Sequence, residues 1–203
     1  MHTTIFETPV INTMMRAVSR AILRLTGWRS EGMTPEQIAL HPKFILIAAP
    51  HTSNWDFPYT LMVCFDLKLK VYWMAKASLF AWPIGWLSRW LGGIAINRSA
   101  KSNTVTNTID AFATRERLAI IVAPEGTRGK VTHWKTGFYH MAHGAGVPIA
   151  LAYLDFNKKT GGIGAMFSPT GSIEADMAVI QEFYRGISGK HPQQFDAGAV
   201  RRD

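Results

Sequence analysis

The sequence is poor in cysteine, in acidic residues and in long apolar runs. Its 203 residues include one cysteine, Cys64, which excludes an intramolecular disulfide and a cysteine-based metal cluster. No uninterrupted apolar stretch reaches about 18 residues, the length typical of a membrane-spanning helix, and no secretory signal is recognisable at the start. We therefore expect a protein of a reducing, cytoplasmic compartment that holds no metal and does not span a membrane.

The composition is instead basic and rich in large apolar side chains. The chain has 22 Lys and Arg against 14 Asp and Glu, a net charge of +8, and 47% hydrophobic residues that include 7 Trp and 11 Phe. One domain can bury such a core. The charge predicts an anionic partner, which could be nucleic acid, an anionic bilayer or an acidic carrier protein. Zinc-finger patterns, RNP-like aromatic motifs and long Lys/Arg runs are missing, so we expect no nucleic acid.

Residues 1–28 are predicted to be a basic amphipathic helical segment, in which apolar residues recur at helical spacing from residue 9 to 28. Arg16, Arg20 and Arg24 recur every four residues on one side. Apolar side chains recur at helical spacing on the other side: Ile11, Met14, Met15, Val18, Ile22 and Leu25. Such a helix either packs on the core with its arginines in solvent or lies on an anionic membrane surface, and both interpretations stay open.

Residues 29–187 alternate between short apolar runs and helix-like stretches, the pattern of an α/β domain. Strands are predicted at 44–49, 69–74, 93–97, 118–123, 149–155 and 163–167, and helices at 56–65, 79–91, 103–115, 136–144 and 175–187. A hairpin turn at 157–162 would join the last two strands, which makes the sheet mixed but mostly parallel. Residues 188–203 are polar and aperiodic, so we predict a poorly ordered tail.

His51 and Asp56 stand where an apolar strand ends and a helix should begin, a place where α/β folds often build sites. An imidazole there can accept a proton from an attacking hydroxyl, and a carboxylate five residues on can hold the other ring nitrogen. The alternatives are a structural histidine and an aspartate favoured in the first helical turn by the helix dipole.

Two further polar clusters follow predicted strands. One is the run from Pro124 to Arg128, and the other ends at Arg98. A loop that offers a carboxylate, a hydroxyl and a guanidinium suits an anionic or polyol ligand, although each arginine alone could simply be solvated.

These clusters resemble the motifs of the glycerolipid acyltransferases, the family typified by lysophosphatidic acid acyltransferase. The family's His-x4-Asp block is matched by His51 and Asp56, and its Glu-Gly-Thr-Arg block by residues 125–128. Its second block, which ends in an arginine, is similar to residues 92–98, and its fourth to residues 147–149. The second block usually carries Asp before its arginine, where this chain has Asn97, so the acceptor is left open.

The resemblance implies transfer of a fatty acyl group from an acyl thioester, on coenzyme A or acyl carrier protein, to a hydroxyl of a lysophospholipid such as 1-acyl-glycerol-3-phosphate. His51 would be the general base, Asp56 would hold its ring, and backbone N–H groups near His51 would stabilise the oxyanion. The acceptor would be bound by the second and third blocks: Arg98, Glu125, Gly126, Thr127 and Arg128. The family implies no cofactor besides the acyl thioester, and a peripheral location on the cytoplasmic surface of a membrane.

The sequence also allows other interpretations. A serine hydrolase could use Ser53, but the sequence has no Gly-x-Ser-x-Gly elbow. A catalytically silent, lipid-binding protein of the same fold stays possible. Cys64 lies in an apolar segment and is expected to be buried. Trp82, Trp86 and Trp90 recur every four residues and predict a buried helix face, or else the lining of an acyl channel or a membrane contact.

Overall fold

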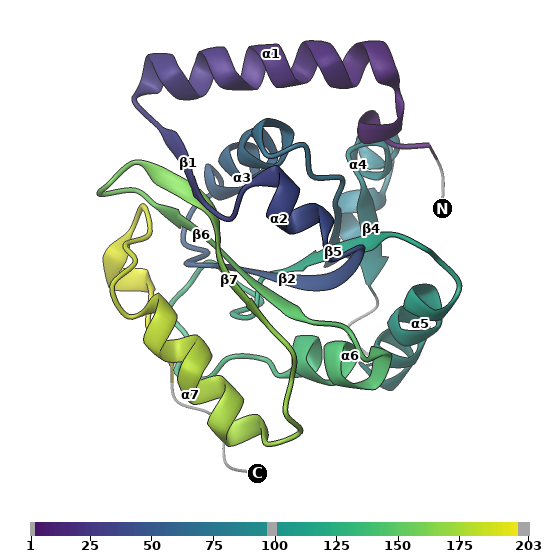
Figure 1. Ribbon diagram of the computed structural model, residues 1–203, viewed down its shortest axis with the longest axis vertical. Helices are drawn as coiled ribbons and strands as arrows, with labels where there is room; N and C mark the ends of the chain where they lie inside the picture. The colour runs from purple at the N-terminus through teal and green to yellow at the C-terminus, as the bar shows by residue number, and fades with distance from the viewer. Residues whose placement is uncertain (1–2, 97–100, 199–203) are drawn as a thin grey trace.

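A seven-stranded sheet organises the computed structural model, which describes residues 3–96 and 101–198 (Figure 1). The strand order is β1-β7-β6-β2-β5-β3-β4, and every neighbouring pair is parallel except β6 and β7. The strands are β1 (Arg29–Gly32), β2 (Lys43–Ala49), β3 (Tyr72–Lys76), β4 (Gly93–Ile96), β5 (Leu118–Val122), β6 (Ile149–Asp155) and β7 (Thr160–Phe167). This confirms the predicted single α/β domain with a mostly parallel sheet.

Helices cover both faces of the sheet (Figure 1). One face carries α1 (Pro9–Thr26), α2 (Pro35–Ala39), α3 (Asp56–Asp66) and α4 (Gly85–Trp90), and the other carries α5 (Lys101–Ala113), α6 (Gly137–Ala145) and α7 (Ile173–Tyr184). Short 3₁₀ turns are η1 (Ile5–Glu7), η2 (Ala77–Phe80) and η3 (Pro192–Gln194).

The central strand β2 shows why the apolar runs of the sequence become strands. Phe44 and Leu46 point into the core beneath α1, α2 and α3, whereas Ile45 and Ile47 point into the core beneath α5, α6 and α7. All four are at most 2% exposed. A strand that is covered on both faces needs apolar side chains at every position, which is the pattern of a parallel sheet.

Two elements were absent from the sequence prediction, β1 and α2. β1 is polar and mostly exposed, so it has no apolar alternation, and it exists because it pairs with β7. Gly162 of β7 permits that pairing, since a Cβ there would lie 1.8 Å from the carbonyl oxygen of Glu31. α2 has only five residues, too few for a helical repeat of apolar positions. Thr34 caps its start, and the hydroxyl of Thr34 accepts the N–H of Gln37 at 3.3 Å.

The predicted helix 79–91 is wrong in its first half. The structure has η2, an irregular stretch and then α4, which begins only at Gly85. Pro83 accounts for the break, because proline has no N–H to donate and disfavours the helical conformation in the residue before it.

The hairpin turn between β6 and β7 is confirmed, but its chemistry differs from the prediction. The turn occupies residues 156–159, and Lys159, not a glycine or asparagine, has the positive φ of 52°. The buried carboxylate of Asp155 stabilises the turn by accepting the N–H groups of Asn157 and Lys158 at 3.0 and 3.1 Å.

α1 is amphipathic, as predicted, but only one edge of its apolar face packs on the rest of the protein. Ser19 and Leu23 are buried, with Ile11 and Met15 packed beside Leu61 and Phe65 of α3. The other apolar side chains of the helix are exposed by 40 to 87%: Val10, Met14, Val18, Ile22 and Leu25. Across the described ranges, none of the helices combines the length and apolar character that crossing a bilayer requires.

Residues 188–198 differ from the predicted poorly ordered tail. Phe156 donates its N–H to the carbonyl of Ser188 at 2.8 Å, and the indole of Trp134 donates to the carbonyl of Asp196 at 3.2 Å. These hydrogen bonds are made mostly to backbone groups, which any sequence supplies, so a polar, aperiodic stretch could not reveal them.

Candidate active site

The first and third sequence motifs meet because β2 and β5 are parallel neighbours in the sheet. Lys43 pairs with Leu118 and Ile47 with Val122, so the two strands end side by side. His51 follows β2 and Glu125 follows β5. The backbone N–H of His51 donates to Oε1 of Glu125 at 2.9 Å, and this bond joins the two loops directly.

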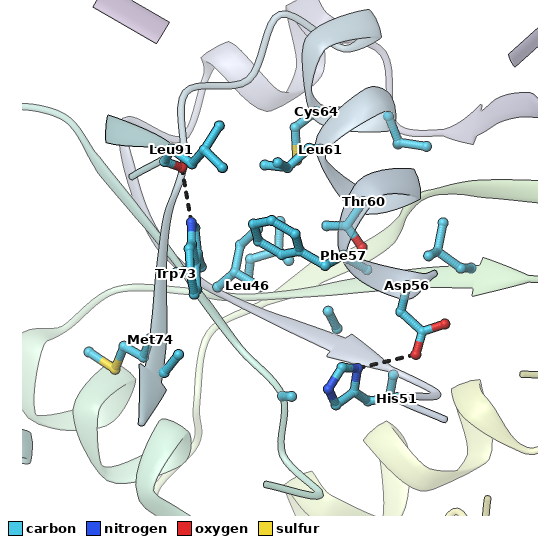
Figure 2. Close-up of a pocket in the computed structure, with 18 of the residues that line it drawn as sticks. Leu46, His51, Asp56, Phe57, Thr60, Leu61, Cys64, Trp73, Met74 and Leu91 are labelled. Carbon is cyan, nitrogen blue, oxygen red and sulfur yellow. Dashed lines mark hydrogen bonds and ion pairs between the residues drawn. The ribbon is translucent and has the colours of Figure 1, made fainter. Parts of the chain in front are cut away.

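Asp56 holds the imidazole of His51 and the turn that carries it. Nδ1 of His51 lies 3.2 Å from Oδ2 of Asp56, with the other ring nitrogen on the far side of the ring (Figure 2). The same Oδ2 accepts the N–H groups of Thr52 and Ser53, each at 2.8 Å. Asp56 is 4% exposed and is the first residue of α3. The carboxylate therefore keeps the proton on Nδ1 and leaves Nε2 able to accept one.

The predicted backbone oxyanion donors are engaged elsewhere. The N–H of His51 is bound by Glu125, those of Thr52 and Ser53 by Asp56, and that of Trp55 by Oγ of Ser53 at 3.1 Å. These four N–H groups already have partners within the protein, so they do not form the oxyanion site that we expected. Ser53 acts as the acceptor of the turn, and this gives its hydroxyl a structural role.

The three side chains of the Glu-Gly-Thr-Arg loop point in different directions. Glu125 is 3% exposed and turned inward, whereas Thr127 and Arg128 are exposed. Gly126 has a φ of +65°, a left-handed conformation that favours glycine. Of the two alternatives for Glu125, contact with the acceptor or ordering of the loop, its bond to His51 favours the second. Arg98 and Asn97 lie outside the described residues.

An apolar cavity of about 470 Å³ opens beside His51. His51, Asp56 and Arg128 line one part of it, and α3 and β3 form walls that run away from His51 towards Leu61 and Cys64 (Figure 2). Most of its lining is aliphatic or aromatic: Leu46, Phe57, Leu61, Leu67, Leu69, Trp73, Ile84, Leu87, Leu91, Ile121 and Ile163. An apolar cavity with a few polar groups at one end suits a ligand that has a long apolar part and a reactive head.

Comparisons with known proteins agree with this geometry. A model of the acyltransferase family matches residues 33–153, which is more than half of the chain and includes His51, Asp56 and residues 125–128. The chain belongs to the acyltransferase family. This confirms the family indicated by the sequence motifs, and with it acyl transfer as the kind of reaction.

The acyltransferase also shares its fold with a solved structure. It is similar to the crystal structure of the 1-acyl-sn-glycerophosphate (LPA) acyltransferase PlsC from Thermotoga maritima, with a TM-score of 0.61 and 19% sequence identity over 87% of this chain and 78% of that chain. A comparison with curated proteins gave no match.

The tryptophans of this acyltransferase do not form the buried helix face that their spacing predicted. Trp82 is 93% exposed and Trp86 is 67% exposed. Neither of them is among the described residues that line the cavity. Trp90 instead is partly buried and packs against the cluster of Ile5, Leu61 and Phe65. The interruption at Pro83 removes the helical register that would have put the three indoles on one side. Cys64 is buried as expected, and burial raises its pKa to about 12.

Glu125 should make the stability of the acyltransferase fall as the pH rises. Burial raises its pKa to about 8, the N–H of His51 opposes this, and nearby Asp56 adds to it. Between about pH 4.5 and 8 the unfolded chain has lost this proton while the folded chain keeps it, so the free energy of unfolding falls through that window. Glu125→Gln removes the loss. In urea titrations, the free energy of unfolding of the variant should increase relative to that of the wild type as the pH rises, by at most about 1.4 kcal/mol per pH unit.

The control for this measurement is Glu116→Gln, the same chemical change at an exposed position. A difference between Glu125→Gln and wild type that stays constant from about pH 5 to 8 would contradict the assignment of a buried, protonated Glu125.

Proposed function

We propose that this acyltransferase moves a fatty acyl group from an acyl thioester to a hydroxyl of a lysophospholipid or a related anionic lipid. The observation that carries the proposal is the His51–Asp56 pair, set at one end of an apolar cavity of about 470 Å³ that Arg128 also lines. The name of the similar Thermotoga maritima enzyme, an LPA acyltransferase, supports a lysolipid acceptor.

The reaction is one displacement through a tetrahedral intermediate. Nε2 of His51 takes the proton of the acceptor hydroxyl while the hydroxyl oxygen attacks the carbonyl carbon of the thioester. The carbon–sulfur bond then breaks, and the leaving thiolate takes the proton from the imidazolium of His51. Asp56 stabilises that imidazolium through its 3.2 Å contact with Nδ1. No acyl-enzyme and no cofactor besides the thioester are needed.

The apolar cavity is suited to the acyl chain. Each buried methylene group contributes about 0.8 kcal/mol of transfer free energy, so an apolar lining favours a long chain over a short one. Leu79, Ile84 and Leu87 line the cavity and are also 37 to 53% exposed, which gives the chain a way in from the surface. A basic protein suits both acidic carriers of the chain, coenzyme A and acyl carrier protein.

A transfer assay tests the proposal. Purified protein is given a long-chain acyl thioester with each of a panel of lysophospholipids and with no acceptor, and the lipid products are identified by mass spectrometry. We expect an acylated lipid and thiol release that depends on the acceptor. Binding of the lysolipids without product or thiol release would favour the catalytically silent, lipid-binding alternative.

Arg128 is proposed to bind the anionic head group of the acceptor, together with Arg98. Loss of a charge-assisted hydrogen bond typically costs about 1.5–3 kcal/mol, so Arg128→Ala should raise the acceptor KM by about tenfold or more and leave the donor KM unchanged. Arg128→Lys should restore activity only in part, because an ammonium group lacks the planar fork of a guanidinium. Kinetics in each substrate separately measure both values.

Arg117→Ala, an exposed arginine before β5, is the matched control. A rise in the donor KM alone would contradict the assignment and would make Arg128 a ligand of the donor's phosphates.

The protein is further proposed to work on an anionic membrane surface, with α1 in contact with it. The exposed apolar stripe of α1, from Val10 to Leu25, offers an apolar face, and Arg16 and Arg24 add positive charge. Arg20 contributes less, because its Nε lies 2.6 Å from Oδ1 of Asp66. Trp82 and Trp86, both exposed, are of the residue type that prefers membrane interfaces.

Exchanging Arg16 and Arg24 for Glu should weaken binding to vesicles that contain anionic lipid, because each basic residue near such a surface contributes about 1 kcal/mol. Co-sedimentation with vesicles measures the change. The control replaces Arg117 and Arg185 with Glu, which alters the net charge equally at exposed positions outside α1. Equal loss of binding in both double variants would show that net charge, and not α1, governs the contact.

A further inference from the structure

Gln194 joins the two loops that carry the sequence motifs. Its side-chain amide faces two carbonyl oxygens, those of Thr52 and Arg128, and an amide meets two acceptors with its nitrogen. In that orientation Nε2 donates to both oxygens at 2.9 Å. Thr52 is the residue after His51, and Arg128 is the last residue of the Glu-Gly-Thr-Arg motif. One side chain therefore bridges the loop of the general base and the loop of the proposed head-group ligand.

Gln194 belongs to residues 188–195, which we call the C-terminal strap. The N–H of His191 donates to Oγ1 of Thr52 at 3.2 Å, and Gly189 is buried against Thr52 and Pro50. Nζ of Lys190 lies 4.8 Å from the ring centroid of Trp55. The strap thus contacts the His51 loop at several points. All residues of the strap lie beyond residue 153, where the match to the acyltransferase family ends.

Thr52 shows how closely the strap holds the loop. The residue is 2% exposed, and three of its polar groups have different partners. Its N–H is held by Asp56 at 2.8 Å, its hydroxyl by His191 and its carbonyl by Gln194. Only the first of these partners lies in the His-x4-Asp motif. The position of His51 relative to the sheet is therefore set from both the motif and the strap.

The bond from the N–H of His51 to Glu125 links the same two loops directly. That bond fixes the start of the Glu-Gly-Thr-Arg loop, whereas Gln194 fixes its end, at Arg128. Arg128 is exposed, and its loop leaves the sheet after β5. Without Gln194 the end of the loop would lose its tie to Thr52, and the distance from Arg128 to His51 would vary.

We infer that Gln194 is a positioning residue that sets the separation between His51 and Arg128. The inference rests on the proposed function: with the head group on Arg128, this separation decides whether the acceptor hydroxyl reaches Nε2 of His51. A misplacement of about 1 Å in such a geometry can cost up to about 10²-fold in rate. Gln194 touches neither reacting atom and acts through the two backbone carbonyls.

The test compares Gln194→Ala, Gln194→Glu and the control Gln193→Ala in the full chain. Gln193 is an exposed residue of the same turn, η3, so its replacement leaves the composition of the strap nearly unchanged. We expect both Gln194 variants to lower kcat/KM for the acceptor by about tenfold or more, with an unchanged donor KM. Gln193→Ala should behave as wild type.

The Gln194→Glu variant adds a readout that a merely structural role would not move. A carboxylate repels two carbonyl oxygens, but a protonated carboxyl can donate to one of them. The ratio of its rate to the wild-type rate should therefore rise as the pH falls. A ratio that does not change with pH, together with kinetics equal to wild type in Gln194→Ala, would overturn the inference.

Hydrogen exchange read by mass spectrometry separates this inference from the proposed function. Exchange should increase in peptides that cover residues 50–56 and 124–130 of both Gln194 variants, whether or not the chosen acceptor is acylated. If wild type transfers no acyl group yet these loops lose protection, the proposed function fails and the tie through Gln194 stands. An equal increase in β6 and α7 would overturn the inference, since it would show a general loss of stability.

Discussion

Replacing His51 with Ala is expected to lower kcat by about 10² to 10⁴, because this is what a general base typically contributes. The fold should be unaffected, since the ring is only partly buried and Asp56, which it contacts, is also held by the N–H groups of Thr52 and Ser53. The hydrogen bond that ties the loop to Glu125 comes from the backbone N–H of residue 51, and alanine keeps it. The KM values should change little, because Nε2 acts on the proton of the hydroxyl and not on the head group or the chain.

His140→Ala, a change of the same chemistry at an exposed position of α6, is the control. Thermal unfolding of both variants checks that the fold is retained, and initial rates at saturating substrates give kcat. If His51→Ala kept more than about a tenth of the wild-type kcat, the base would be another group.

The sheet could be predicted from the sequence because its central strands contain runs of consecutive apolar residues. β2, β5 and β6 are covered on both faces, and a run such as Phe44 to Ile47 is typical of a strand that is buried on both sides. β1 could not be predicted in this way. Its residues are polar, and its pairing depends on Gly162, far along the chain.

Some of the predicted site residues lie together because they follow the ends of two neighbouring strands, β2 and β5. His51, Asp56 and Glu125 follow apolar strands, and parallel strands bring their carboxyl ends to one edge of the sheet. The sequence could not tell that Glu125 would face the backbone of His51, because that depends on β2 and β5 being neighbours. The order of strands in a sheet is a tertiary property.

The remaining differences arise where backbone groups or surfaces decide the outcome. The strap is held in part through the N–H of His191 and the backbone carbonyls of Ser188 and Thr52, and no side-chain pattern records these groups. The helical spacing of α1 identified its apolar residues, but Ser19 and Leu23 face the core while Met14 and Leu25 face outward. Periodicity shows which residues share a side of a helix, and packing decides which side is buried.

Exchanging Asp56 for Asn should lower kcat by about 10²-fold or more, somewhat less than the loss of His51, and leave the fold intact. The amide oxygen of Asn can still accept the N–H groups of Thr52 and Ser53, which now donate to Oδ2 at 2.8 Å each. Its nitrogen would take the place of Oδ1, a buried atom that has no hydrogen-bond partner among the described residues. What Asn cannot supply is the negative charge beside Nδ1 of His51, and it is this charge that stabilises the imidazolium during transfer.

Asp56→Ala separates the two roles of the carboxylate, because it removes the acceptor of two buried N–H groups as well as the charge. Each buried donor left without a partner costs about 1 to 3 kcal/mol, so the Ala variant should lose thermal stability as well as kcat. Unfolding curves and kcat measured for both variants give four values. If Asp56→Asn kept the wild-type kcat while Asp56→Ala lost stability, Asp56 would serve only to begin α3 and close the turn at Thr52. Nδ1 of His51 would then need another partner during transfer.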